Sequence, residues 1–199
     1  MVAGILALPA YGIGALIVLL LYVVETEVRF GAKARSRSGG ASDRGSTLVL
    51  SLASAVPIVG FVLAMKGRIA TNLPAMPVLA WLGVILAALG LMLRLWAVLI
   101  LRERFTRTLL LQDQHSIERG GPYRFVRHPG YLGSLLCLNG IGLASGNGLA
   151  FLASMVATFA AYSYRVRAED AMLVAGFGAA YENYRQETAA LIPFIRPRR

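Results

Sequence analysis

The stretch YLGSLLCLNGIGLASGNGLAFLASMVATFAAYSY, residues 131–164, contains 34 residues and no charged side chain. A helix of about 20 apolar residues crosses the hydrocarbon core of a bilayer, so this stretch is too long for one membrane span and long enough for two. Its centre, GLASGNGL at residues 142–149, is rich in residues that form turns. The sequence therefore predicts two spans, at about 131–145 and 147–166, that form a tight helical hairpin.

Three more apolar blocks precede this stretch, at about 2–24, 48–65 and 76–101. The first has no charged residue, the second contains Pro57, and the third is interrupted only by Arg94. In the whole chain 57% of the residues are hydrophobic and 15% are charged, whereas soluble domains contain about 25% charged residues. We therefore predict an all-α polytopic membrane protein with about five transmembrane helices in a single domain, residues 1–199.

Basic residues are distributed unequally between the predicted loops. The loops at about 25–47 and 102–130 and the chain beyond Tyr164 contain 17 of the 20 Lys and Arg residues. The positive-inside rule then places these segments in the cytoplasm and the N-terminus outside. This topology accounts for most of the net charge of +10, so the charge gives no reason to expect a nucleic-acid partner. We expect contact between the basic segments and anionic membrane lipids.

The expected location is the inner membrane of a prokaryote. The first apolar block lacks the basic start of a signal peptide and is too long for one, so we expect it to be retained as an anchor.

The chain beyond Tyr164 changes from apolar to amphipathic, in RVRAEDAMLVAGFGAAYENYRQETAAL. Apolar residues recur there at helical spacing, with charged residues between them. We expect the last span to continue into an amphipathic cytoplasmic helix in the tail 167–199, with a break at the glycines of 176–178. At the start of the second span, Ser46 or Thr47 is the expected N-cap residue.

The segment GGPYRFVRHPGYLG, residues 120–133, is stiff and cationic. Its two prolines fix local backbone angles and favour extended conformations at the preceding residues, Gly121 and His128. This stiff segment contains Arg124, Arg127 and His128, and the combination predicts a binding site for an anionic or carboxylate-bearing ligand. A basic loop in contact with lipid phosphates explains the same features, and the segment by itself does not separate these interpretations.

Two arginines near the predicted cytoplasmic face carry further hypotheses. Arg165 and Glu169 lie one helical turn apart, which fits either a surface ion pair or a guanidinium that holds a substrate carboxylate and is oriented by the acid. Arg94 lies inside a span, where it either snorkels to the interface or lines a cavity. Tyr181 and Tyr184 are expected to pack the amphipathic helix rather than to catalyse.

Taken together, these motifs resemble the isoprenylcysteine carboxyl methyltransferase family. The resemblance is carried by QDQHSIERG, GPYRFVRHPGYLG and RVRAEDAML…FGAAYENY…IP, and it covers roughly residues 75–197. Members of that family are integral-membrane enzymes that use S-adenosylmethionine, and the phospholipid methyltransferases are their wider relatives. The combination of motifs is specific, although no single piece of it is.

The resemblance implies a cofactor site at the cytoplasmic ends of the last spans. The residues implied to bind S-adenosylmethionine are Gln112, His115, Tyr123, Arg127, His128, Pro129, Tyr131, Glu169 and Asp170. Arg165 and Glu169 are the implied catalytic residues, with Arg165 beside the reacting carboxylate. Asp170 stands where the family more often has a glutamate.

The implied reaction is methyl transfer to a lipid-linked acceptor, foremost carboxyl O-methylation of an isoprenylcysteine or a similar isoprenoid carboxylate. A carboxylate is ionised at neutral pH and needs only desolvation and alignment. A phenolic lipid would need a base, for which His115, His128 or Glu169 are available; a thiol or a lipid amine also fits.

No metal is expected, because one cysteine and two histidines offer no zinc-type ligand set. Two alternatives come from other functional classes: an NADPH-dependent sterol-type reductase, and a non-enzymatic transporter or assembly protein.

Overall fold

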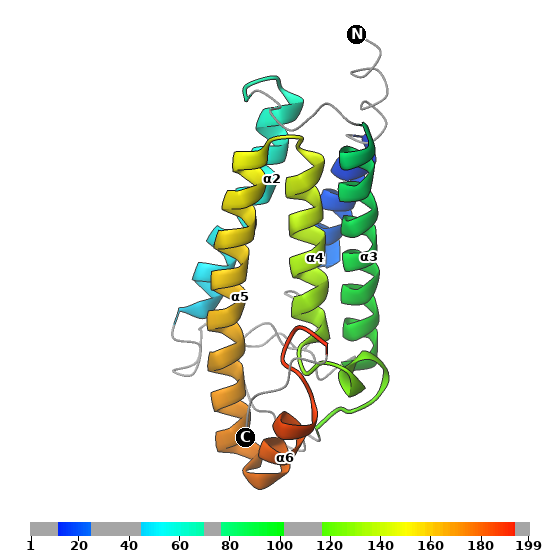
Figure 1. The fold of residues 1–199 in the computed structure, drawn as a ribbon. Helices are drawn as coiled ribbons and strands as arrows, with labels where there is room; N and C mark the ends of the chain where they lie inside the picture. Colours follow the sequence, from blue (N-terminus) through cyan, green and yellow to red (C-terminus); the bar gives the residue numbers. More distant parts are fainter. Residues whose placement is uncertain (1–11, 25–44, 70–76, 102–116, 194–199) are drawn as a thin grey trace.

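The protein is a bundle of long helices with a small cap at one end (Figure 1). The computed structural model describes residues 12–24, 45–69, 77–101 and 117–193. Its elements are the helix Gly12–Val24, α2 (Ser46–Met65), α3 (Pro77–Leu101), the 3-10 helix η2 (Gly121–Arg124), α4 (Pro129–Ala144), α5 (Gly148–Phe177) and α6 (Ala179–Glu187). Within these residues the extended pairing is a single isolated bridge, between Val126 and Ala189. The predicted all-helical class is confirmed.

Three of the helices are long and apolar enough to cross a membrane: Ser46–Met65, Val78–Leu101 and Gly148–Phe177. The helix Gly12–Val24 is apolar but shorter, and the first part of the predicted span 2–24 lies outside the described residues. Large apolar side chains such as Leu48, Leu99 and Leu149 point away from the bundle and are exposed. An outward apolar surface of this extent is typical of helices that face lipid. The count of five spans stays a prediction.

Helices α3 and α4 pack closely because glycines face each other across their contact. A Cβ atom added at Gly90 would lie 2.3 Å from the backbone N of Cys137, and one added at Gly140 would lie 2.4 Å from the backbone N of Ala87. Gly83 and Gly133 have the same backbone-to-backbone proximity. Small residues at helix contacts allow this approach in membrane bundles. This contact fixes where α4 begins relative to the end of α3.

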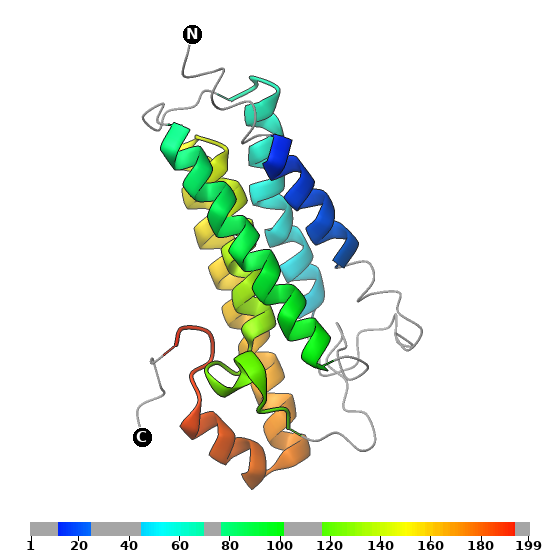
Figure 2. The ribbon, with the colours of Figure 1, turned by 90° about the vertical axis from the view of Figure 1, so that its right-hand side faces the viewer.

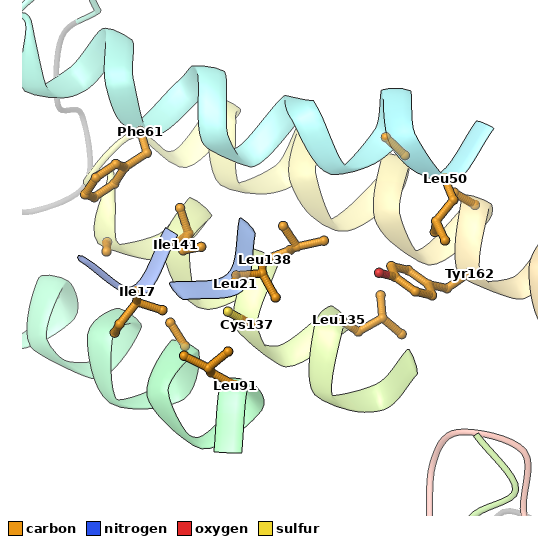
Figure 3. Packing of buried hydrophobic residues seen from close by; sticks show 14 of the residues in the cluster. Ile17, Leu21, Leu50, Phe61, Leu91, Leu135, Cys137, Leu138, Ile141 and Tyr162 are labelled. Atoms are coloured by element: carbon orange, nitrogen blue, oxygen red, sulfur yellow. The ribbon is translucent and has the colours of Figure 1, made fainter. Parts of the chain in front are cut away.

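The apolar core lies where Gly12–Val24, α2, α3, α4 and α5 meet (Figure 3). Leu138 and Ile141 of α4 are almost fully buried there, together with Phe61 of α2. The Phe61 ring sits against Gly14, where an added Cβ would lie 2.7 Å from its tip. The first helix therefore packs into the bundle through a glycine that leaves room for an aromatic ring.

Helices α4 and α5 are antiparallel neighbours joined by residues 145–147 (Figure 1). Gly146 takes a positive φ of 68° in the turn, and the Asn147 side chain caps α5 by accepting a hydrogen bond of 2.8 Å from the Ala150 N–H. Deeper in the pair, Asn139 donates to Thr158 Oγ1 at 3.0 Å. This side-chain hydrogen bond satisfies polar groups that would be costly to leave unpaired between apolar helices.

Two local expectations differ from the structure and a third agrees with it. The N-cap of α2 is Gly45, with φ 74° and no side-chain cap hydrogen bond, so Ser46 and Thr47 lie inside the first turn and their hydroxyls have other partners. Gly121 is not extended but has φ 51°, a conformation that its lack of a Cβ allows. As expected, helix α5 continues beyond residue 166, to Phe177, and the helical run breaks within 176–178, where the chain turns at Gly178 (φ 55°) into α6.

Candidate active site

The predicted motif residues gather at one end of the bundle, where α3 ends, α4 begins and α5 extends past its neighbours (Figures 1 and 2). Figure 2 shows η2 beside the segment that follows α6. The backbone N–H groups of Arg127 and His128 donate to the carbonyls of Ala189 and Ala190, at 2.8 and 3.1 Å. The segment 188–190 is therefore paired with the motif that starts α4.

Further contacts attach the same motif to α6 and to α3. The Tyr184 hydroxyl donates to the Tyr123 carbonyl at 2.6 Å, and the Tyr123 hydroxyl donates to the Ala97 carbonyl of α3 at 3.3 Å. Arg119 forms an ion pair of 3.0 Å with Glu187 at the end of α6. The motif is thus held between α3 on one side and α6 on the other.

Asp170 is the centre of a buried polar network. Its carboxylate accepts from Arg127 Nη2 at 3.0 Å, contacts His128 Nε2 at 2.9 Å and accepts from the Tyr181 hydroxyl at 2.5 Å. Arg127 Nη1 also donates to the carbonyls of Arg185, at 2.9 Å, and Thr188. A buried charge is stable only when it is paired and hydrogen-bonded, and Arg127 satisfies that condition with partners from the protein itself.

The tyrosines of this network are hydrogen-bond donors in their neutral form. Burial raises the pKa of the Tyr181 hydroxyl, and the charge of Asp170 raises it further. Burial likewise raises the pKa of Tyr184 to about 12. Both side chains pack as expected, since both are buried. Each hydroxyl also makes a specific hydrogen bond, which the sequence interpretation missed although the FGAAYENY motif contains both residues.

Arg165 forms a second buried cluster beside the first. Its side chain is 1% exposed. Nε donates to the Tyr131 hydroxyl at 3.0 Å, and Nη1 donates to Ser46 Oγ at 2.7 Å and Thr47 Oγ1 at 3.1 Å. Ser46 and Thr47 were missed as site residues because only long-range packing brings the start of α2 to α5.

His128 connects the two clusters. Its ring stacks on Tyr131 with centroids 5.5 Å apart, and its Nδ1 lies 3.7 Å from Glu169 Oε2 while its Nε2 faces Asp170. The imidazole is therefore held between two carboxylates that are adjacent in the sequence. Glu169 follows Arg165 by one helical turn on α5, so Arg165, Glu169 and His128 occupy one region of the site.

Two buried polar atoms of this region have no hydrogen-bond partner within the described residues: Arg127 Nε, a donor, and Glu169 Oε2, an acceptor. Unsatisfied buried polar atoms are rare in folded proteins and call for an explanation. A ligand that carries both acceptors and cationic or hydroxyl donors would satisfy this pair.

The structure thus brings together eight of the predicted site residues: Tyr123, Arg127, His128, Pro129, Tyr131, Arg165, Glu169 and Asp170. Gln112 and His115 lie outside the described residues. Arg124 does not converge with Arg127, because it is exposed and lies over the Phe125 ring at 5.0 Å.

Arg94 is 4% exposed, which favours a place inside the protein over a lipid-facing side chain that snorkels. Among the described residues, no group of three or more His, Cys, Asp or Glu side chains is arranged to hold a metal ion.

Known proteins resemble this chain in sequence and in fold. The model of the phospholipid methyltransferase family matches residues 78–180. The chain is 31% identical over 118 residues to a probable protein-S-isoprenylcysteine O-methyltransferase of Oryza sativa subsp. indica, which is 58% of this chain and 62% of that protein. It is also 35% identical over 121 residues to the cobalt-zinc-cadmium resistance protein CzcN of Cupriavidus metallidurans, or 60% of this chain and 50% of that protein.

The fold has a counterpart among solved structures. The eukaryotic intramembrane Ras methyltransferase ICMT matches with a TM-score of 0.71 and 22% sequence identity, over 96% of this chain and 68% of that one. The sequence matches span less than two thirds of the two curated relatives named above. The family model covers more than half of the chain, the resemblance to isoprenylcysteine methyltransferases is confirmed, and the chain belongs to the phospholipid methyltransferase family.

Proposed function

We propose that the protein is an S-adenosylmethionine-dependent methyltransferase that esterifies a carboxylate on a lipid-linked acceptor, foremost an isoprenylcysteine or a similar isoprenoid carboxylate. The observation that carries the proposal is the placement of buried Arg165 one turn from Glu169, with His128 3.7 Å from that acid. A fixed guanidinium and an adjacent acid–imidazole pair at one end of an apolar bundle can align a charged acceptor head with a cationic donor.

The residues present fit the proposed cofactor. S-adenosylmethionine carries an ammonium, a sulfonium and hydroxyl donors, and also a carboxylate and ring acceptors. Glu169 Oε2 is a buried acceptor and Arg127 Nε a buried donor, neither of which has a hydrogen-bond partner among the described residues. We assign Glu169 to the cationic part of the cofactor, and Tyr123, His128, Pro129, Tyr131 and Asp170 to the walls that surround it. Gln112 and His115 complete the proposed set.

Arg165 acts on the acceptor in this proposal. When bound, S-adenosylmethionine would supply a methyl group on a cationic sulfur, and transfer of that methyl group to the acceptor oxygen would leave the electron pair of the broken carbon–sulfur bond on sulfur. An acceptor carboxylate is already ionised, so no residue needs to remove a proton. Arg165 holds the carboxylate in line, and the closely packed helices around it exclude water.

The membrane arrangement that accompanies this function is part of the proposal. We infer five spans, with α4 and the first part of α5 as a membrane hairpin, and a single domain over residues 1–199. The N-terminus lies outside and α6 lies on the cytoplasmic side, with the protein in a prokaryotic inner membrane. Support comes from the distribution of basic residues and from the gathering of the motif residues at one end of the bundle (Figure 1).

The test is methyl transfer by the purified protein in lipid nanodiscs. We expect labelled methyl from S-adenosylmethionine to appear on a prenylated cysteine carboxylate as a base-labile ester, with less transfer to a prenylated phenol. Calorimetry should show binding of S-adenosylhomocysteine and no competition by NADPH. Binding of NADPH instead, or no transfer to any carboxylate, phenol, thiol or amine lipid, would overturn the proposal.

A further inference from the structure

We propose that Ser46 and Thr47, at the start of α2, are positioning residues that orient Arg165 for the acceptor carboxylate. This rests on the proposed function, in which Arg165 is the group that holds the acceptor. It also extends the site beyond residues 78–180, the part of the chain that the family model matches.

The geometry joins two segments that are far apart in the sequence. Arg165 Nη1 donates to Ser46 Oγ at 2.7 Å and to Thr47 Oγ1 at 3.1 Å. Ser46 is completely buried. Gly45 begins α2 without a side-chain cap, so the two hydroxyls that a helix start would ordinarily use for its own N–H groups point at the guanidinium instead.

These hydroxyls fix the orientation of the guanidinium plane. Nε is held by the Tyr131 hydroxyl on one side and Nη1 by two hydroxyls on the other, and a planar group held at two of its three nitrogens has little freedom to rotate. All three of these partners are neutral. They supply hydroxyl oxygens that fix the direction of the Arg165 guanidinium, whereas Arg127 is oriented by the Asp170 carboxylate.

Packing next to the cluster keeps the two helices in this register. Leu50, one turn after Ser46, and Tyr162, three residues before Arg165, are both buried in the shared core. Figure 3 shows Leu50 of α2 and Tyr162 of α5 near the same end of that core. The start of α2 is therefore held against α5 by apolar contacts, and its hydroxyls add the directional contacts that aim Arg165.

The experiment compares hydroxyl-deleting and hydroxyl-keeping variants of the full chain in nanodiscs. The variants are Ser46→Ala/Thr47→Val and Thr47→Val, with Thr47→Ser as the conservative replacement. Ser54→Ala is the matched control, since Ser54 lies on the same helix and donates 2.7 Å to the Leu50 carbonyl. Each is assayed for kcat and KM with a prenylated cysteine carboxylate, for the Kd of S-adenosylhomocysteine, and for thermal unfolding.

We expect the double variant to lose about tenfold or more in kcat/KM, as for one hydrogen bond to a charged group, while its cofactor Kd stays within about twofold of the unmodified protein. Thr47→Ser and Ser54→Ala should keep normal kcat/KM. Thr47→Val alone, at a half-buried position, provides the same comparison with a smaller loss if the double variant does not fold.

Three results would overturn the inference. The first is unchanged kcat/KM in an otherwise active protein. The second is a parallel fall of kcat/KM and cofactor affinity, which indicates a merely structural role. The third is a loss in Thr47→Ser as large as in Thr47→Val. If the unmodified protein transfers no methyl group, the proposed function itself is wrong. The two failures can be told apart, because this one is seen before any substitution is made.

Discussion

Replacing Gly90 by alanine tests whether the close contact of α3 with α4 holds the bundle together. The added Cβ would lie 2.3 Å from Cys137 N and 2.6 Å from Gly133 O. Both atoms belong to the backbone of α4, so neither can rotate away and the helices must separate. Overpacking of this kind typically costs about 1–3 kcal/mol. We take the upper end of that range because the contact is backbone to backbone.

Alanine also favours the helical state over glycine by about 1 kcal/mol, which offsets part of the cost. The expected net loss for Gly90→Ala is therefore about 2 kcal/mol. Gly12→Ala is the matched control, because a Cβ there meets nothing within 4 Å. It gains helix propensity without a clash.

Unfolding by SDS in mixed micelles measures these differences. Trp81 and Trp96 are the two tryptophans of the chain and both lie on α3, so their fluorescence follows the separation of α3 from α4. Gly140→Ala, with a Cβ 2.4 Å from Ala87 N, should resemble Gly90→Ala. The reasoning fails if Gly90→Ala is as stable as Gly12→Ala.

Three further predictions concern the polar network. Asp170→Asn should lower the free energy of unfolding by about 3–5 kcal/mol, since it leaves a buried arginine without its counter-charge; thermal unfolding should show no comparable effect of Glu182→Gln, which removes a half-exposed i,i+3 ion pair. Tyr181→Phe should cost about 1.5–3 kcal/mol in the same assay, and a neutral result would mean that the 2.5 Å contact with Asp170 adds nothing. Arg165→Ala should abolish turnover while calorimetry still detects cofactor binding, whereas His128→Ala should weaken that binding, and the opposite pattern would exchange the two roles.

Hydropathy was sufficient to predict where the main helices lie. The blocks 48–65 and 76–101 closely match α2 and α3, because an apolar run of that length with at most one charged residue has few folded alternatives. The end of α5 was also predicted, since the apolar spacing continues through the charged residues Arg165 to Asp170 and the glycines of 176–178 indicated the break that follows Phe177. Charge marks where a helix leaves an apolar environment, not where its hydrogen bonding stops.

The site was predicted in part. Local motifs identified Arg127, His128, Arg165 and Asp170, which the structure places together. The partners of Arg165 on α2 could not be predicted, because nothing near Ser46 indicates which distant side chain its hydroxyl will meet. The donation from Tyr181 to Asp170 likewise depends on the turn at Gly178, which has a positive φ. The glycines of 176–178 indicated a break there, but not the direction that the chain takes after it.

The order in which the chain is synthesised has a consequence for Asp170. Asp170 lies on α5, its partners come from two other segments, the residues just before α4 and the helix α6, and the carbonyls that hold Arg127 lie as late as Thr188. All the long helices precede these last partners in the chain. The polar network can therefore close only after the rest of the bundle has been synthesised, so a chain truncated shortly before Tyr181 should keep the packed core and lack the closed network around Asp170.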